Sequence, residues 1–209
     1  MEMMNDFFKN NGYVFIPGVI SDPNNLFCPP PVDSEGNYLS GQLCFSGKKI
    51  VQTLSNENQV EGSFARYNFP RYKRIHHLIG KLLEGELGID LFPTYFYERF
   101  YYIGQELTRH TDRPSCEISV TLQISSNSNK PWPIWFQLPD GSETSVEMND
   151  GDVVVYKGCE REHWREPLQS RYGRVKRLWK RSDDTYHHQI FLHYVDAQGP
   201  YVQYAFDRG

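Results

Sequence analysis

The sequence predicts a mainly β protein: a jelly roll of two sheets with one supporting long helix and an N-terminal extension. Aromatic residues make up 15% of the chain, and they favour strands. One long segment has helical periodicity, whereas the pattern from Leu91 onward has a period of two residues. We expect residues 1–209 to form a single domain, with the extension and helix in 1–90 and the jelly-roll core in 91–196.

The extension is expected to contain little regular structure. A short amphipathic helix is predicted over residues 5–11, followed by a strand over 13–16. Residues 21–48 are rich in Pro, Asn, Ser and Gly and are predicted to be mostly loop. A strand is expected over 49–54, and residues 62–70 are expected to be extended or irregular.

The main helix is predicted from Arg71 to Glu86. Its apolar residues recur every three or four positions, which gives one apolar face, and Gly85 and Gly88 end it. His76 and His77 lie on this helix. We interpret them as surface or packing residues, because no carboxylate or cysteine sits at ligand spacing on the same face.

The second half of the chain alternates between apolar and polar residues. Strands are expected near residues 94–102, 105–109, 116–124, 133–138, 144–148, 152–156, 161–167 and 187–196. Eight strands after one long helix fit a jelly roll with the helix packed on its outer face. Residues 1–60 should cover one end, because their apolar content is too low for a separate core.

Composition excludes several functional classes. The net charge of −4 does not favour a nucleic-acid partner or an anionic membrane surface. No stretch is apolar enough to predict a membrane span, and the N-terminus lacks the pattern of a signal peptide. The four cysteines are scattered without a CxxC pair, which is typical of reduced thiols in a cytoplasmic protein.

A basic insert is the exception to the acidic balance. It carries six cations, Arg171, Arg174, Lys176, Arg177, Lys180 and Arg181. Such a run could bind the phosphate backbone of a nucleic acid. A solvated loop is the favoured interpretation, and a nucleic-acid partner is therefore not expected.

The chemistry is predicted from three residues, His110, Asp112 and His163. In an extended segment residues i and i+2 face the same way, so His110 and Asp112 can offer a nitrogen and a carboxylate oxygen to one point. His163 follows 53 residues after His110. Two histidines and one carboxylate form the facial triad of non-haem Fe(II) oxygenases. The alternative is a surface turn and a hydrogen-bonded core histidine.

A wider pattern surrounds these residues in two blocks, 97–123 and 151–167. The matching positions are Tyr101, Gly104, Gln105, His110 and Asp112 in the first block, and Gly151, Asp152, His163, Glu166 and Pro167 in the second. The pattern resembles the 2-oxoglutarate/Fe(II)-dependent oxygenases, in particular their prolyl 4-hydroxylase-like branch. The resemblance covers about half of the chain, residues 93–196. It implies a double-stranded β-helix, Fe(II) and 2-oxoglutarate as cofactors with ascorbate as an optional addition, molecular oxygen as co-substrate, and His110, Asp112 and His163 as catalytic metal ligands.

Two positions depart from that branch. Leu107 stands where the branch places a tyrosine that contacts 2-oxoglutarate. The late-strand position of its usual lysine or arginine falls near His187 or Gln189, neither of which is a permanent cation.

Another residue must then hold the far carboxylate of the co-substrate, because a buried dianion needs a cation or several donors. Arg165 is the first candidate, since it lies two residues after His163 and shares its face on a strand. Arg99 is the second candidate, and Tyr101 and Gln189 are possible neutral donors.

The resemblance implies hydroxylation of an unactivated C–H bond, by default on a prolyl or other protein or peptide side chain. A free amino acid or a small metabolite is the alternative substrate, and a nucleobase, suggested only by the basic insert, comes third. A non-catalytic binding protein of cupin type, holding a sugar or a structural metal, is the alternative from another class.

Overall fold

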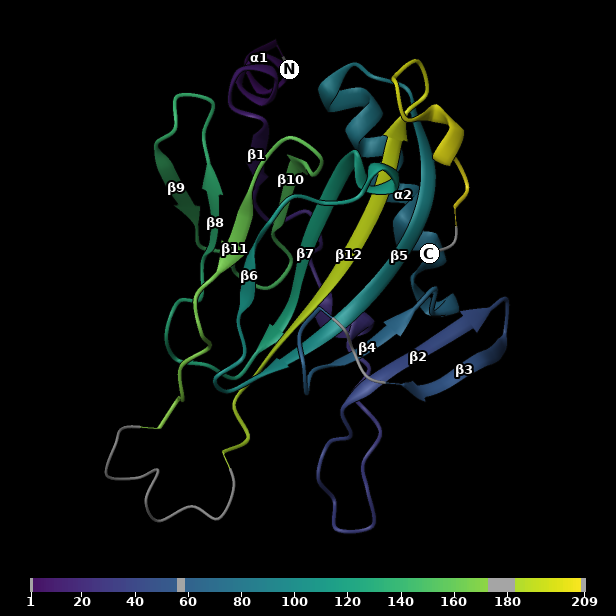
Figure 1. Cartoon of the computed structure of the whole chain (residues 1–209), viewed down its shortest axis with the longest axis vertical. Helices are drawn as coiled ribbons and strands as arrows, with labels where there is room; N and C mark the ends of the chain where they lie inside the picture. The colour runs from purple at the N-terminus through teal and green to yellow at the C-terminus, as the bar shows by residue number, and fades with distance from the viewer. Residues whose placement is uncertain (1, 56–58, 173–182, 208–209) are drawn as a thin grey trace.

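The computed structural model describes residues 2–55, 59–172 and 183–207 (Figure 1). Within them, twelve strands form two sheets. The strands are β1 (Tyr13–Ile16), β2 (Gly41–Ser46), β3 (Lys49–Ser55), β4 (Phe64–Tyr67), β5 (Leu91–Tyr102), β6 (Leu107–His110), β7 (Ile118–Ser126), β8 (Ile134–Gln137), β9 (Glu143–Val146), β10 (Val153–Lys157), β11 (His163–Arg165) and β12 (Tyr186–Asp196). The helices are α1 (Glu2–Asn11) and α2 (Lys73–Leu87), with short 3-10 turns η1 (Pro23–Leu26), η2 (Pro70–Tyr72), η3 (Pro114–Cys116) and η4 (Val202–Tyr204).

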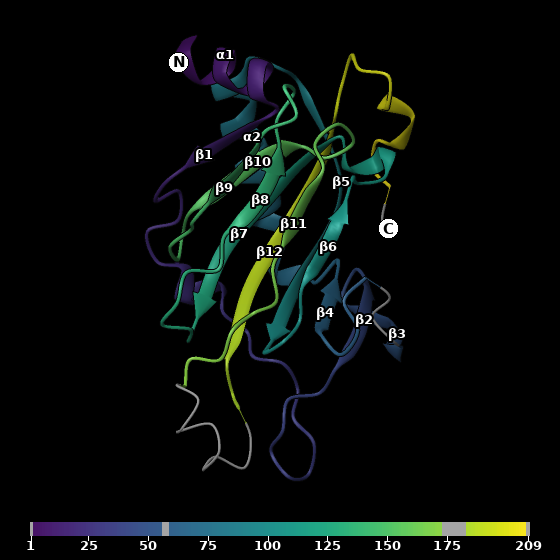
Figure 2. The same ribbon diagram turned by 60° about the vertical axis from the view of Figure 1, so that its left-hand side comes forward.

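The eight strands predicted for the second half of the chain form the jelly roll. The larger sheet has the order β1-β10-β7-β12-β5-β4-β2-β3, and the smaller sheet has the order β6-β11-β8-β9. Along the chain the core strands cross repeatedly between the two sheets, except that β8 and β9 form a hairpin within the smaller sheet, and the sheets face each other (Figure 2). The predicted fold class is confirmed.

Helix α2 packs on the outer face of the larger sheet, as predicted. Its buried residues Ile79 and Leu83 belong to the same apolar cluster as Val120, Leu122 and Leu192 of β7 and β12. Helix α2 begins at Lys73 rather than Arg71, because Pro70 to Tyr72 form the short turn η2. Gly88, at φ 65°, ends the helix in the left-handed conformation that glycine adopts without strain.

The N-terminal segment differs from the prediction in two ways. The expected loop over 21–48 contains strand β2, which pairs with β3 and runs parallel to β4. Residues 1–60 also extend the larger sheet instead of covering one end, because β1 adds to β10 while β2 and β3 add beyond β4 (Figure 1). The strands over 13–16 and 49–54 were predicted, whereas β2 was not, because its residues are mostly half-buried and show no clear alternation.

None of the helices in the described ranges is both long and apolar enough to cross a membrane.

Candidate metal centre

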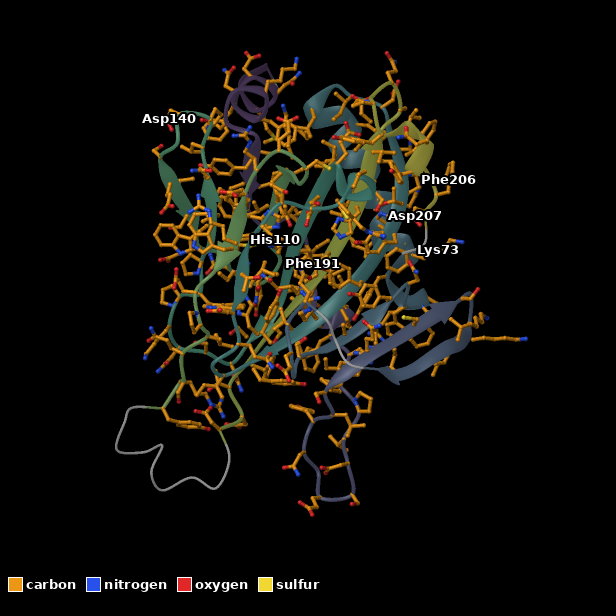
Figure 3. The ribbon with its side chains drawn as sticks, in the orientation of Figure 1. Lys73, His110, Asp140, Phe191, Phe206 and Asp207 are labelled. Carbon is orange, nitrogen blue, oxygen red and sulfur yellow. The ribbon has the colours of Figure 1, made fainter. Side chains whose placement is uncertain are left out.

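The register of the smaller sheet brings His110 and His163 together. β11 pairs with β6 in antiparallel fashion, and His163 lies directly opposite His110. The two imidazole ring centres are 4.4 Å apart. A register shift between His163 and Arg165 sets Arg165 opposite Leu107. His110, labelled in Figure 3, lies midway along the molecule.

Each histidine uses one ring nitrogen locally and leaves the other for a ligand. His110 Nδ1 is 2.7 Å from the Thr108 carbonyl oxygen, and His163 Nδ1 is 3.0 Å from the Arg161 carbonyl oxygen. A carbonyl only accepts, so both Nδ1 atoms carry the proton. In the neutral imidazoles both Nε2 atoms therefore present a lone pair, as metal-ligating histidines do.

Asp112 completes the group. Its Oδ1 is 3.5 Å from His110 Nε2 and 3.6 Å from His163 Nε2. The three candidate ligand atoms lie within 4.8 Å of one another. The Asp112 amide donates to the Gly158 carbonyl at 2.8 Å, which fixes the backbone after β6. One nitrogen from each histidine and one carboxylate oxygen thus converge on a single point.

Electrostatics favour a divalent cation at this point. Burial opposes ionisation of Asp112, but His163, the hydrogen bond with His110 and other neighbours hold the pKa of its carboxyl well below the usual range. Burial lowers the pKa of His163, which keeps that imidazole neutral. Burial also disfavours the charged form of His110, yet its hydrogen bonds to Asp112 and Thr108 raise its pKa. An ionised carboxylate beside neutral imidazole suits metal coordination.

Gln59 is a residue of the site that sequence reasoning did not find. Its Nε2 lies 3.0 Å from His110 Nε2, the nitrogen that would bind a metal. The amide therefore has to leave this nitrogen when a metal binds. Gln59 is exposed and belongs to no strand or helix, so no periodic pattern in the sequence could have indicated it.

Arg165 lies inside the molecule, as its spacing from His163 predicts. It is 2% exposed, and its Nη1 donates to the Trp132 carbonyl oxygen. The guanidinium carbon lies 4.8 Å from the centre of the Trp132 ring. Across the described ranges no acidic side chain forms an ion pair with it. Burial lowers its pKa to about 10, so it stays protonated at neutral pH. A buried cation with only neutral neighbours is suited to an anionic ligand.

The other three candidates for binding the co-substrate line the inner face of the larger sheet. Arg99, on β5, is fully buried, and its Nη1 donates to the Tyr101 hydroxyl at 3.3 Å. Gln189, on β12, lies opposite Arg99 and donates to Gln123 Oε1 at 3.1 Å. The Tyr101 ring meets the Trp132 ring at 4.9 Å, which connects this group to the wall around Arg165.

Trp132 and His187 also belong to this region, and His187 is one of the two residues near which the late-strand position of the usual lysine or arginine falls. The His187 ring lies 4.8 Å from the Trp132 ring, and neither of its nitrogens has a hydrogen-bond partner among the described residues. Both residues line a polar cavity of about 650 Å³. Trp132 lies in the loop before β8 and His187 lies on β12. The two residues are far apart in the sequence, and only the tertiary structure brings them together.

The basic insert falls mainly outside the described residues. Only Arg171 of its six cations is described, and it pairs with Asp184 at 2.6 Å. Arg174, Lys176, Arg177, Lys180 and Arg181 lie outside the described ranges.

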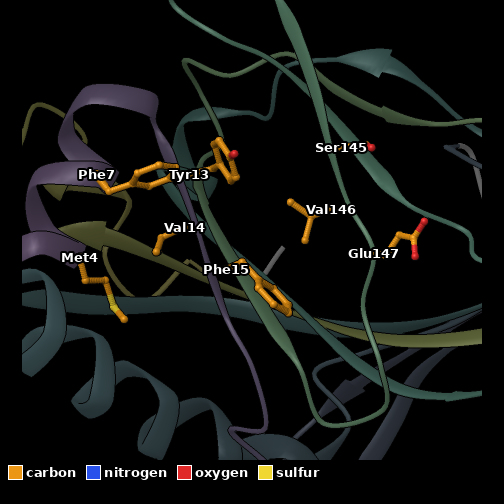
Figure 4. A pocket seen from close by; sticks show the side chains of 8 residues that line it. All are labelled: Met4, Phe7, Tyr13, Val14, Phe15, Ser145, Val146 and Glu147. Atoms are coloured by element: carbon orange, nitrogen blue, oxygen red, sulfur yellow. The ribbon is translucent and has the colours of Figure 1, made fainter.

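A separate apolar groove lies between α1, β1 and β9 (Figure 4). It is lined by Met4, Phe7, Tyr13, Val14, Phe15, Ser145, Val146 and Glu147, and its volume is about 590 Å³. None of the candidate metal ligands and none of the buried arginines lines it, so it is not part of the metal centre.

Solved structures of known proteins share the fold of this chain. No protein-family model and no curated protein sequence matches the chain. A Pseudomonas putida prolyl-4-hydroxylase has 14% identity and a TM-score of 0.59, over 93% of this chain and 97% of its own. A Trichoplax adhaerens prolyl hydroxylase, solved with a hypoxia inducible factor peptide fragment, has 16% identity and a TM-score of 0.60, over 94% and 89%. A 2OG-Fe(II) oxygenase family oxidoreductase from Burkholderia pseudomallei has 12% identity and a TM-score of 0.58, over 92% and 88%. The chain therefore has the fold of the 2-oxoglutarate/Fe(II) oxygenases, prolyl hydroxylases among them.

Proposed function

We propose that the protein is a 2-oxoglutarate- and Fe(II)-dependent dioxygenase that hydroxylates an unactivated C–H bond. The observation that carries this proposal is the convergence of His110 Nε2, His163 Nε2 and Asp112 Oδ1, while both Nδ1 atoms are held by backbone carbonyls. Three ligands on one face leave the remaining coordination positions of an iron ion open. When bound, the iron supplies oxygen activation, which no side chain can provide.

In this proposal the chain's own residues hold the co-substrate. Arg165 forms a charge-assisted pair with the 5-carboxylate of 2-oxoglutarate. Its position opposite Leu107 supports this assignment, because Leu107 stands where the branch that the sequence resembles places a tyrosine that contacts 2-oxoglutarate. Trp132 packs against the guanidinium and shields it from water. Arg99 is the second candidate for the same carboxylate, and Tyr101 and Gln189 supply neutral donors.

The substrate proposed first is a prolyl or other side chain of a protein or peptide. The prolyl hydroxylases among the proteins of this fold support this choice. A cluster of aromatic rings also supports it, because Tyr95, Tyr97 and Phe191 of β5 and β12 are buried together with Tyr101. Aromatic rings are suitable neighbours for a small apolar ring. A free amino acid or a small metabolite is the second candidate, since an epimerase of nogalamycin biosynthesis also shares the fold, at 12% identity and a TM-score of 0.62.

The decisive experiment separates an oxygenase from a cupin-type binding protein. Fe(II) is added under anaerobic conditions, followed by 2-oxoglutarate, and the visible spectrum is recorded. A weak charge-transfer band after the second addition is expected only when the 2-oxo acid chelates the iron. A protein that binds Fe(II) without producing this band contradicts the proposal. Succinate release, screened over peptides, free amino acids and single-stranded oligonucleotides with and without ascorbate, then identifies the substrate class.

We also propose that the protein is cytoplasmic. Its four cysteines form no disulfide within the described ranges, which is typical of a reducing compartment. Fractionation of cells that express a tagged chain tests this location.

A further inference from the structure

The second oxygen of Asp112 has its own partner. Ser119, on β7, donates its hydroxyl to Asp112 Oδ2 at 2.6 Å. Ser119 is fully buried, and its hydroxyl oxygen also lies 3.1 Å from His193 Nδ1. Ser119 and His193 are directly opposite each other in the pairing of β7 with β12. Ser119 of the larger sheet therefore contacts the candidate metal ligand Asp112, and His193 of the same sheet contacts Ser119.

Only one placement of the protons on Ser119 and His193 fits the contacts among Asp112, Ser119 and His193. Ser119 has a single hydroxyl proton, and the carboxylate at 2.6 Å is its closest acceptor. His193 Nδ1 must then carry the proton and donate to Ser119 Oγ. His193 is held in place, because its ring lies 4.7 Å from that of Tyr95, and its carbonyl oxygen is 3.0 Å from His76 Nε2 of helix α2.

Gly158 allows this close packing. A β-carbon at this position would lie 2.5 Å from Asp112 Oδ2, 2.7 Å from Ser119 Oγ and 2.3 Å from the Cys116 carbonyl oxygen. Real β-carbons do not approach other atoms this closely, so any larger residue would push Asp112 and Ser119 apart. The carbonyl of the same glycine accepts the Asp112 amide proton at 2.8 Å.

We propose that Ser119 and His193 are positioning residues that hold Asp112 as a one-oxygen metal ligand. The hydroxyl of Ser119 occupies Oδ2, which leaves Oδ1 directed at His110 and His163. His193 directs the Ser119 proton toward the carboxylate and away from the Cys116 carbonyl, which lies 3.1 Å from Ser119 Oγ. This proposal rests on the proposed iron site and adds the residues that orient one of its ligands.

The test measures metal affinity directly and does not require a substrate. Co²⁺ is titrated into the full chain as an air-stable substitute for Fe(II), and its visible ligand-field bands report both affinity and coordination. Loss of a partner of a metal ligand typically weakens metal binding by about 10- to 100-fold. Ser119→Ala is expected to weaken Co²⁺ binding by about this factor and to change the band intensities, because Oδ2 becomes available to the metal.

Two variants of His193 test whether this residue orients the Ser119 hydroxyl toward Asp112. Asn places an amide donor near the position of Nδ1, so His193→Asn is expected to retain most of the affinity. Phe keeps an aromatic ring but has no donor, so His193→Phe is expected to lose affinity as Ser119→Ala does. Thr94→Val is the matched control, because Thr94 is a buried hydroxyl that donates to the Ser115 carbonyl at 2.7 Å and does not contact Asp112. It should bind Co²⁺ as the parent chain does.

Three results would overturn the proposal. Ser119→Ala could bind Co²⁺ with unchanged affinity and spectrum, or Thr94→Val could lose as much affinity as Ser119→Ala. The third is a thiolate-to-cobalt band that disappears in Cys116→Ser, because Asp112, Cys116 and His193 also lie within 4.8 Å of one another and would then be ligands themselves. If the proposed iron site itself is wrong, the result differs from these three. The parent chain and Asp112→Ala would then bind Co²⁺ equally.

Discussion

At the scale of single residues, the geometry of the candidate metal centre depends on how each side chain uses its second polar atom. His110 and His163 bind backbone carbonyls through Nδ1, and Asp112 binds Ser119 through Oδ2. The three candidate ligands are therefore held in one orientation before any metal arrives, which lowers the entropic cost of binding.

Asp112→Ala should abolish Fe(II) binding and turnover while leaving the fold intact. Asp112 supplies the only carboxylate of the group, and its side chain contacts the site rather than the apolar core. Equilibrium dialysis with Fe(II) measures the loss, and circular dichroism checks the fold. Asp140→Ala removes an exposed carboxylate in a turn and should bind iron normally. Retention of iron by Asp112→Ala would exclude the proposed triad.

Arg165→Lys should raise the apparent KM for 2-oxoglutarate strongly and change iron affinity little, because an ammonium cannot form the two parallel hydrogen bonds of a guanidinium. Arg165→Ala should nearly eliminate activity, since loss of a buried charged partner costs about 3–5 kcal/mol. Succinate formation at increasing 2-oxoglutarate measures both effects. Arg99→Lys is the matched comparison on β5, and a larger rise in KM for that variant would make Arg99 the anchor.

The sequence allowed the candidate ligands to be found but not the residues around them. His110 and Asp112 are two positions apart, so a local rule predicts that they share a face. Ser119 meets His193 only through the register of β7 with β12, and Gln59 reaches His110 from a segment without periodicity. Both contacts depend on chain pairing that a single sequence does not specify.

At the scale of elements, strand prediction succeeded where β-branched and aromatic residues fill short segments between turn residues. Burial alternates with a period of two along β8 and β9, whereas β7, β10 and β12 are buried almost throughout. β2 was missed because it lies near the edge of the larger sheet and its six residues are mostly half-buried. Helix α2 was found because one of its faces is apolar over its full length.

Helix α2 also carries a histidine that should make stability depend on pH. Burial lowers the pKa of His76 to about 4, against a usual value of 6.5. As the pH falls below 6.5 the unfolded chain takes up a proton that the folded chain does not bind until about pH 4. The contribution of His76 to the free energy of unfolding is therefore complete above pH 6.5 and falls by on the order of 3 kcal/mol toward pH 4.

His76→Gln keeps a donor near the His193 carbonyl but does not titrate, so its free energy of unfolding should fall less steeply over this range. Urea denaturation between pH 7 and pH 4 gives the slopes. His77→Gln, at an exposed neighbouring position, is the control and should show the parent slope. Equal slopes for His76→Gln and the parent chain would contradict the assignment.

At the scale of the whole molecule, a buried polar cluster joins the N-terminal third to the jelly roll. Glu98 of β5 is fully buried and accepts hydrogen bonds from Arg66 of β4 and from Tyr72 at the start of α2. His188 Nε2 of β12 lies 2.6 Å from the same carboxylate, and Arg66 also donates to the Cys28 carbonyl. We propose on this basis that residues 1–209 fold as one cooperative domain, which a single calorimetric transition would support.

Arg66→Met should destabilise the protein by about 3–5 kcal/mol, because it leaves the buried Glu98 without its cationic partner. The double variant Arg66→Met with Glu98→Gln should lose less, since the uncompensated charge is then absent. Thermal and urea unfolding measure both variants. Equal losses for the single and double variants would mean that the charge of Glu98 does not cause the effect.

The pairing of β6 with β11 would also determine when the proposed iron could bind during biosynthesis. His110 and His163 are 53 residues apart and meet only when β6 pairs with β11 in the smaller sheet. A metal ion cannot then nucleate folding, because the long loop between its ligands must close first. In stopped-flow experiments, Fe(II) should leave the refolding rate unchanged and slow unfolding. Newly made chains would fold first and load iron afterwards, so scarcity of iron would leave an intact apoprotein rather than a misfolded one.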